Sequence, residues 1–242
     1  MMAQQSLLRR KWFAIVVMLM VCWTVYLAAK IGIADLVAIQ SRRAISEWDQ
    51  QKSRPPLRQW LTTRDQIKLA RDLDPANPVF VEDLGRIYDR RLRDQSADSA
   101  ATQAFAEQAL IYFRQAVRQR PVSAYSWADV ALIKLKLDRT DEEFLNALQQ
   151  AIVWGPWEPD VQFIVAEAGL ATWDKLSPQT RAAVSVTLER VAVRHAEYLT
   201  RIAKNHARMH ILCSTLKQTS LLPASACDTI MTESTGHPGQ KK

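Results

Sequence analysis

The sequence predicts an all-α protein, with an N-terminal transmembrane helix followed by an α-solenoid of stacked helical repeats. Three observations support this prediction. An uncharged apolar segment of eighteen residues, 12–29, lies near the start of the chain. From residue 57 to about 216 the apolar residues recur at a helical period, without strand-like alternation. Two of the predicted helices also carry similar residues at the same offsets.

The apolar segment reads "WFAIVVMLMVCWTVYLAA". As a helix it is about 27 Å long, close to the thickness of the hydrocarbon core of a bilayer. A cleaved signal peptide usually has a shorter apolar region, of about 7–15 residues, and a small-x-small cleavage site. Here Lys30 stands where cleavage is expected. We therefore predict an uncleaved anchor at 12–34, followed by a helix and a Pro-containing linker at 35–56.

The charge pattern predicts the orientation of this anchor. The chain has a net charge of +7, and its first 30 residues contain Arg9, Arg10, Lys11, Lys30 and no acid. Because 28 basic and 25 acidic residues share the rest of the chain, a nucleic-acid partner is not expected. The basic cluster before the helix predicts that residues 1–11 stay in the cytoplasm of a bacterium. The remainder is then expected in the periplasm, on a single-pass inner-membrane anchor.

A repeated pattern lies in the middle of the chain. "ALIYFRQAVRQRP" and "FLNALQQAIVWGP" share a pattern at offsets 0, 4, 7 and 12. Offset 0 holds alanine or phenylalanine, offset 4 a large apolar residue, offset 7 alanine and offset 12 proline. The positions are Ala109, Phe113, Ala116 and Pro121, and then Phe144, Leu148, Ala151 and Pro156. Helices that precede them contribute Leu84, Gly85 and Tyr88 in the first case, and Trp127 in the second. This pattern resembles tetratricopeptide repeats over about residues 60–172, within a predicted domain at 57–216; a generic helical bundle is the alternative.

The stretch "WGPWEP" lies between two predicted repeats. We expect Gly155 to adopt a left-handed helix C-cap and Pro156 to prevent continuation of the helix. Trp154 and Trp157 are then expected to cover the cores of adjacent repeats, so that replacing either by alanine costs about 3 kcal/mol. The alternative is an exposed platform on which sugar rings or a partner peptide stack.

In a tetratricopeptide-like array the first helix of each repeat lines a concave groove that receives a partner. With Trp127 as the reference position, helical geometry predicts which side chains face this groove. They are Glu82, Arg86, Arg90, Tyr125, Lys136, Asp160, Phe163 and Glu167.

The sequence contains few signs of catalysis. It has no phosphate-binding glycine loop, G-x-S-x-G motif or dinucleotide fingerprint, so we expect no enzymatic activity and no cofactor. "TDEE", residues 140–143, is interpreted as a capping box, and Asn77-Pro78 and Ser177-Pro178 are each predicted to begin a helix. A weak metal candidate is His206, His210 and Cys213 on one face of a helix. Cys213 and Cys227 are expected either to pair or to remain free thiols, in or beside a tail, 217–242, that we expect to be disordered.

Three phrases, "RPVSAYSWADVALIKLKL", "WGPWEPDVQFIVAEAGLATW" and the leading apolar helix, resemble the small VpsP-type proteins of bacterial exopolysaccharide clusters. The resemblance covers about residues 105–190 and the anchor. It implies a scaffold or adaptor in polysaccharide assembly or export, with partner proteins, or the polysaccharide itself, bound to the repeats. A periplasmic chaperone, translocon accessory or cytochrome-maturation factor is one alternative, and a carbohydrate-active or metal-dependent enzyme is another.

Overall fold

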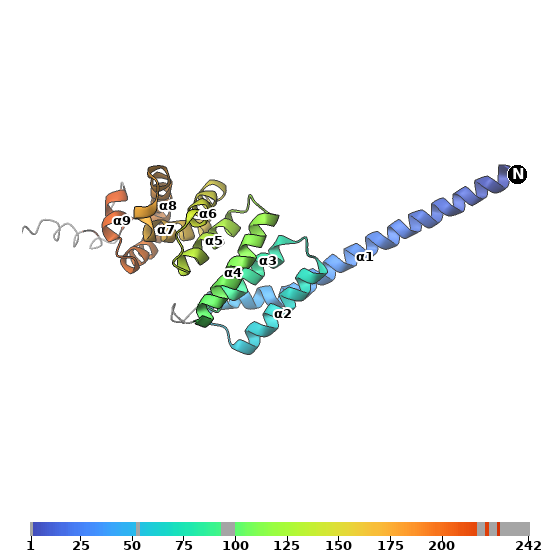
Figure 1. Ribbon diagram of the computed structural model, residues 1–242, viewed down its shortest axis with the longest axis horizontal. Helices are drawn as coiled ribbons and strands as arrows, with labels where there is room; N and C mark the ends of the chain where they lie inside the picture. The colour runs from blue at the N-terminus through green and yellow to red at the C-terminus, as the bar shows by residue number, and fades with distance from the viewer. Residues whose placement is uncertain (1, 52–53, 93–99, 217–220, 223–226, 228–242) are drawn as a thin grey trace, which may run out of the picture. The chain divides into compact units, whose positions relative to one another are not determined.

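The computed structural model describes residues 2–51, 54–92, 100–216, 221–222 and 227. The described residues form nine α-helices and one short 3-10 helix, and no strand occurs among them (Figure 1). The all-α prediction is therefore confirmed for this part of the chain. Contacts divide the chain into two compact units, Met1–Asp94 (unit 1) and Gln95–Lys242 (unit 2). The boundary between the units falls inside the repeat domain predicted at 57–216, which stays a prediction.

Unit 1 contains helices α1 (Met2–Gln51), α2 (Leu57–Leu73) and α3 (Pro78–Arg90). Its core combines side chains from all three helices, including Trp48, Trp60 and Phe80. The indole of Trp60 donates a hydrogen bond to the carbonyl of Ile87 (2.8 Å). Asn77 accepts a hydrogen bond from the backbone N–H of Val79, so the N-cap predicted before Pro78 is confirmed.

Helix α1 runs without a break from an exposed apolar segment into the core of unit 1. Residues Lys11–Gln51 form the one helix, among those described, that is long and apolar enough to cross a membrane, and its most apolar window has a mean hydropathy of 2.2. The N-terminal part extends away from α2 and α3 (Figure 1), whereas Ala34, Ala38, Ile45 and Trp48 are buried. Residues 35–51, part of the helix and linker expected at 35–56, form one continuous helix with the apolar segment and reach the core of unit 1.

Unit 2 contains α4 (Ala100–Gln119), α5 (Ala124–Lys136), α6 (Glu142–Trp154), α7 (Pro159–Ala171), η1 (Trp173–Lys175), α8 (Pro178–Asn205) and α9 (Met209–Thr215). Each α-helix packs on the next α-helix along the chain, and α5 also packs on α7. The expected start at Ser177-Pro178 is confirmed, because Ser177 accepts a hydrogen bond from the N–H of Thr180 (3.1 Å). Before α6 the cap is Asp141, which accepts from Phe144, whereas the predicted capping box began at Thr140.

Most residues of the repeated pattern lie in the two cores. In unit 1 these are Leu84, Gly85 and Tyr88, and in unit 2 they are Ala109, Phe113, Ala116, Phe144, Leu148 and Ala151. Trp127 is half-buried, and its indole donates a hydrogen bond to the carbonyl of Pro121 (2.7 Å), just after α4 ends. The small residues at these positions leave room for the neighbouring helix, because alanine and glycine side chains occupy little volume.

Gly155 ends α6 for a reason that differs from the prediction. Its backbone has φ −127° and ψ 44°, so it does not adopt the expected left-handed conformation. A Cβ atom at this position would lie 2.6 Å from Cβ of Ala124 and 3.1 Å from Cγ1 of Val161. Glycine is therefore required by the close approach of α5 and α7, and the "WGP" segment is a joint between helices.

The C-terminal part of unit 2 has a bend and a covalent link. His195 has non-helical backbone angles (φ −137°, ψ 42°), which divide α8 into two straight parts. Cys213 of α9 forms a disulfide with Cys227. Pairing, one of the two states that the sequence left open, is thus the one found. Of the tail predicted to be disordered, residues 217–220, 223–226 and 228–242 lie outside the described residues.

Candidate partner-binding surface

In unit 1 the predicted groove residues belong largely to an ion-pair network. Glu82 is only 5% exposed, which excludes it from an open binding surface. Arg86 and Arg90 are half-buried, and the guanidinium of Arg90 pairs with the carboxylates of Asp49 and Asp89. These contacts connect α3 to the C-terminal part of α1 and thereby help to hold unit 1 together.

A second ion pair, between Arg42 and Asp83, joins the same two helices, and no motif indicates it. Nε of Arg42 lies 3.1 Å from Oδ2 of Asp83, and its guanidinium carbon lies 5.2 Å from the centre of the Phe80 ring. Burial raises the pKa of Asp83, although the positive charges of Arg42 and Arg86 oppose this shift. Arg42 and Asp83 are 41 positions apart in the sequence, so no local pattern could predict this ion pair.

In unit 2 the residues predicted on α5 lie at the surface. Tyr125 and Lys136 are exposed, and they lie on the same side of α5 because eleven residues correspond to about three helical turns. The hydroxyl of Tyr125 donates a hydrogen bond to the carboxylate of Glu158, just before α7. Asp160, in the first turn of α7, is also exposed. Tyr125, Lys136 and Asp160 define what we call the α5–α7 surface.

The other two residues predicted on α7 are covered instead. Phe163 contacts the rings of His195 and Tyr198 edge-on, at centroid distances of 4.9 and 4.8 Å. Glu167 accepts a hydrogen bond from Tyr198 (3.4 Å). His206 also lies near this carboxylate, with Nε2 at 3.9 Å. The part of α8 after the bend therefore packs on α7 at this point, and Phe163 and Glu167 are half-buried beneath it.

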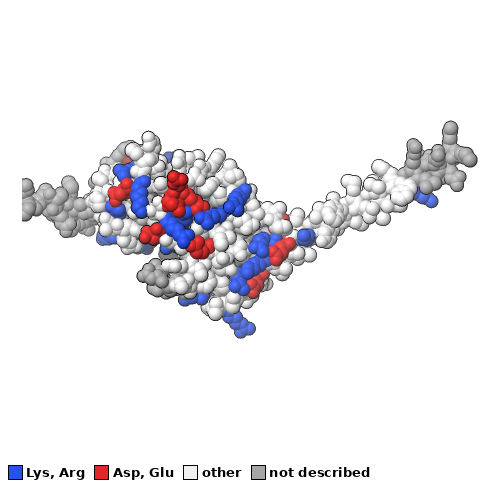
Figure 2. Space-filling model, in the orientation of Figure 1, with Lys and Arg blue, Asp and Glu red and all other residues white. Residues whose placement is uncertain are grey.

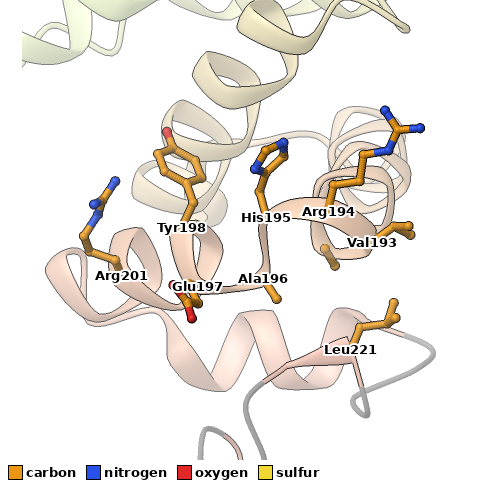
Figure 3. Close-up of a pocket in the computed structure, with 9 residues that line it drawn as sticks. Val193, Arg194, His195, Ala196, Glu197, Tyr198, Arg201 and Leu221 are labelled. Carbon is orange, nitrogen blue, oxygen red and sulfur yellow. The ribbon is translucent and has the colours of Figure 1, made fainter. Parts of the chain in front are cut away.

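The bend in α8 also borders a cavity of about 630 Å³. Figure 3 shows Arg194, His195, Tyr198 and Arg201 projecting from one side of the bent segment, while Glu197 points to the other side. The guanidinium of Arg201 lies 5.3 Å from the centre of the Tyr198 ring. Burial raises the pKa of Tyr198, and the neighbouring carboxylate of Glu167 adds to this effect. The phenol consequently stays protonated and acts as a hydrogen-bond donor, while the arginines suit carboxylate or phosphate groups.

The two tryptophans of "WGPWEP" lie at the surface, so the expectation that they cover repeat cores is wrong. Trp154 is 48% exposed and Trp157 is 73% exposed. The indole of Trp154 donates to the side-chain oxygen of Gln150. The guanidinium carbon of Arg190 lies 4.0 Å from the centre of the Trp157 ring, and the same guanidinium donates to the carbonyl of Pro156. Exposure of both rings is consistent with the alternative of a platform.

We therefore expect Trp154→Ala and Trp157→Ala each to lower the free energy of unfolding by at most about 1 kcal/mol. The reason is that neither tryptophan is enclosed in a core, since the two residues are 48% and 73% exposed, and an exposed cation–π contact contributes about 0.5–1 kcal/mol. Urea unfolding of the full chain in detergent, followed by far-ultraviolet circular dichroism, measures this change. A loss near 3 kcal/mol would restore the interpretation of the tryptophans as core residues.

The weak metal site predicted at His206, His210 and Cys213 is not formed. The sulfur of Cys213 is bonded to Cys227, and so it is not available as a thiolate ligand. His206 follows the end of α8, whereas His210 belongs to α9, because the backbone turns at Ala207 with φ 54°. The three residues therefore do not share one helix face as predicted. Among the described residues, no cluster of three or more His, Cys, Asp or Glu side chains is placed to bind a metal ion.

A buried lysine organises another part of unit 2. Lys134 is 1% exposed, and its ammonium lies 2.8 Å from Asp141 and 2.5 Å from Glu143. Arg114 of α4 makes two further hydrogen bonds to Glu143, at 2.7 and 2.6 Å. Hydrogen bonding to Arg114, and then to Lys134, lowers the pKa of Glu143 to about 2. From the sequence these carboxylates were expected only to cap the N-terminus of α6, because a buried lysine cannot be recognised from its neighbours in sequence.

The visible surface carries no large area of one charge. Figure 2 shows basic and acidic side chains interspersed over the two units, and most of the N-terminal part of α1 is uncharged. A phosphate backbone requires a continuous basic face. The face in view shows no continuous basic area of this kind.

Comparisons with known proteins do not identify a family. No family model matches the chain. No curated protein matches it at a significant level. The resemblance to VpsP-type proteins consequently stays a prediction.

Proposed function

We propose that this protein is a non-enzymatic, membrane-anchored adaptor whose helical repeats bind partner proteins outside the cytoplasm. The observation that carries the proposal is the packing of α5 on both α6 and α7. In tetratricopeptide-like arrays, the first helix of a repeat contacts its own second helix and the first helix of the next repeat. Together with the buried small residues of the repeated pattern, this packing supports a tetratricopeptide-like solenoid in which α5 and α7 are successive first helices.

Two features support an extracytoplasmic location on a retained anchor. The disulfide between Cys213 and Cys227 suits an oxidising compartment such as the bacterial periplasm. Helix α1 continues through Lys30 into the core of unit 1, whereas a signal peptide ends at a small-x-small site. The basic cluster before the apolar segment favours a cytoplasmic N-terminus.

The α5–α7 surface is the proposed partner site in unit 2. It retains Tyr125, Lys136 and Asp160 from the predicted groove, because these side chains are exposed. The exopolysaccharide part of the proposal rests on the resemblance of residues 105–190 and the anchor to VpsP-type proteins. The partners are accordingly proposed to be proteins of a polysaccharide assembly or export machinery in the inner membrane.

The topology gives a direct prediction. Alkaline phosphatase fused after Leu216 should be active, and green fluorescent protein fused at the same position should be dark, because both report export of the fused residue. A fluorescent and phosphatase-negative pair would contradict the periplasmic location. Mass spectrometry of the mature chain separates anchor from signal: a chain that begins near Lys30 would refute retention.

The partner site is tested by photo-crosslinking in cells. A photoreactive amino acid at Lys136 should capture polysaccharide-assembly proteins, and a matched probe at Ile111, an exposed residue of α4, should not. Charge reversal by Lys136→Glu should weaken capture by a probe at Tyr125 without lowering stability, because surface substitutions usually change it by about 0.5 kcal/mol or less. Equal capture by the probes at 111 and 136 would contradict the proposed site.

A further inference from the structure

One side of α1 remains apolar beyond Lys30, where the uncharged segment 12–29 has ended. Ile33, Leu36 and Ile39 are 51%, 68% and 39% exposed. At 100° per residue, they lie on the side of the helix opposite Ala34 and Ala38, which are fully buried. Unit 1 therefore covers one side of α1 and leaves an aliphatic stripe uncovered on the other.

The stripe ends abruptly. After Ile39, the next residues on the same side of α1 are polar and exposed: Arg43, Glu47 and Gln50. Exposed aliphatic side chains are costly in water, since burying one fully is worth about 1.5–3 kcal/mol. The change from aliphatic to charged residues thus marks a change of surroundings along a single helix face.

Helix length indicates what those surroundings are. From Trp12 to Lys30 the helix rises about 27 Å, which matches the hydrocarbon core of a bilayer. On the far side of the core, the headgroup layer adds about 5–8 Å, which is about three to five residues of helix. Ile33 and Leu36 therefore fall within this layer, and Ile39 lies at its outer edge.

We propose that unit 1 begins inside the headgroup layer of the membrane, with Ile33, Leu36 and Ile39 in contact with lipid. The inference rests on the anchor of the proposed function. Lipid is the proposed occupant because the stripe continues the lipid-facing side of the span without interruption. Val25 and Leu36, for example, are eleven residues apart and occupy nearly the same angle around the helix; both are more than half exposed.

Helix α2 packs antiparallel to α1 and is therefore placed at the same depth relative to the membrane. The hydroxyl of Ser41 donates to the side chain of Gln66 (2.8 Å), which fixes the register of α1 against α2. Since the helices run in opposite directions, the end of α2, near Leu73, lies level with Ala34. The turn between α2 and α3 is consequently placed at the membrane surface, while the start of α2 faces away from it.

The test uses three single-cysteine variants on one helix face: Val25→Cys, Leu36→Cys and Glu47→Cys. Each is made in the full chain with Cys22→Ser, so that the remaining cysteines are the disulfide pair. The variants are labelled with bimane and reconstituted into vesicles of phosphatidylethanolamine and phosphatidylglycerol. Quenching is then measured with nitroxide lipids, labelled at the headgroup or on the acyl chain, and with aqueous iodide.

The label at position 36 should be quenched several-fold more by the headgroup nitroxide than the label at position 47, and less by iodide. Equal quenching of the two by iodide would overturn the proposal, because both positions would then face water. Protection of position 36 from both quenchers, or oxidative crosslinking of Leu36→Cys into dimers, would overturn it in favour of a protein contact. A label at position 25 that escapes the acyl-chain nitroxide would refute the anchor itself, and this inference with it.

Discussion

Replacement of Gly169 by leucine is expected to lower the free energy of unfolding by about 3 kcal/mol, because no side chain fits between α7 and α8 at this position. A Cβ atom on Gly169 would lie 2.5 Å from Cγ1 of Val184 and 3.0 Å from its Cγ2. Val184 is fully buried and β-branched, so it cannot turn away at low cost. Urea unfolding of the full chain in detergent, followed by circular dichroism, measures the loss.

Smaller changes at the same contact provide the control. Gly169→Ala should destabilise the wild-type chain, although alanine favours a helix over glycine by about 1 kcal/mol. In a chain that already carries Val184→Ala, the same change should be neutral or stabilising, because the valine methyl groups are gone. If Gly169→Ala costs the same in both backgrounds, contact with Val184 is not the reason for glycine at this position.

Removal of the buried lysine is expected to have a comparable effect. Lys134→Ala should lower the free energy of unfolding by about 3 kcal/mol, since it empties the volume of a fully buried side chain and removes the cation between two carboxylates. Lys134→Met retains most of the volume and isolates the electrostatic part. Its cost should be about 1–2 kcal/mol, below that of a fully buried pair, because the Asp141 and Glu143 side chains are 55% and 36% exposed. Equal stability of Lys134→Met and wild type would show that the ion pairs contribute nothing.

The cluster of Lys134, Asp141 and Glu143 predicts that the stability of the protein falls at low pH. The pKa of Glu143 is about 2 in the folded chain, against an ordinary value of 4.5, so the unfolded chain binds more protons between these values. The stabilisation by Glu143 is complete above about pH 4.5 and is lost as the pH falls towards 2. Asp141 acts in the same direction, because its hydrogen bond to Lys134 lowers its pKa. Glu143→Gln should flatten the acid side of a plot of melting temperature against pH, and an unchanged slope would contradict this assignment.

Sequence reasoning succeeded where the cause is local. Asn77-Pro78 and Ser177-Pro178 begin helices as predicted, because a side-chain acceptor and a proline act within one turn. The small and aromatic residues of the repeated pattern are mostly buried, since helical periodicity alone determines which residues share a face. Helix class and most helix starts therefore follow from neighbours in sequence.

Errors occurred where distant residues decide the outcome. Trp154 and Trp157 were expected in a core because they are large and aromatic, yet they are 48% and 73% exposed. Phe163 and Glu167 were expected in a groove, but α8 bends at His195, a residue with no proline or glycine beside it, and covers them. Burial of Lys134 likewise depends on helices that meet only after folding.

Because α1 is continuous, the direction in which α2 and α3 face is fixed relative to the apolar N-terminal segment of α1. One alanine inserted after Lys30 would turn unit 1 by about 100° and move it outward by about 1.5 Å, whereas four inserted residues would restore its heading to within about 40°. A protein that binds the apolar segment in a fixed orientation therefore also sets the direction in which α2 and α3 face. Rotation of the apolar segment about its axis is transmitted through α1 to α2 and α3.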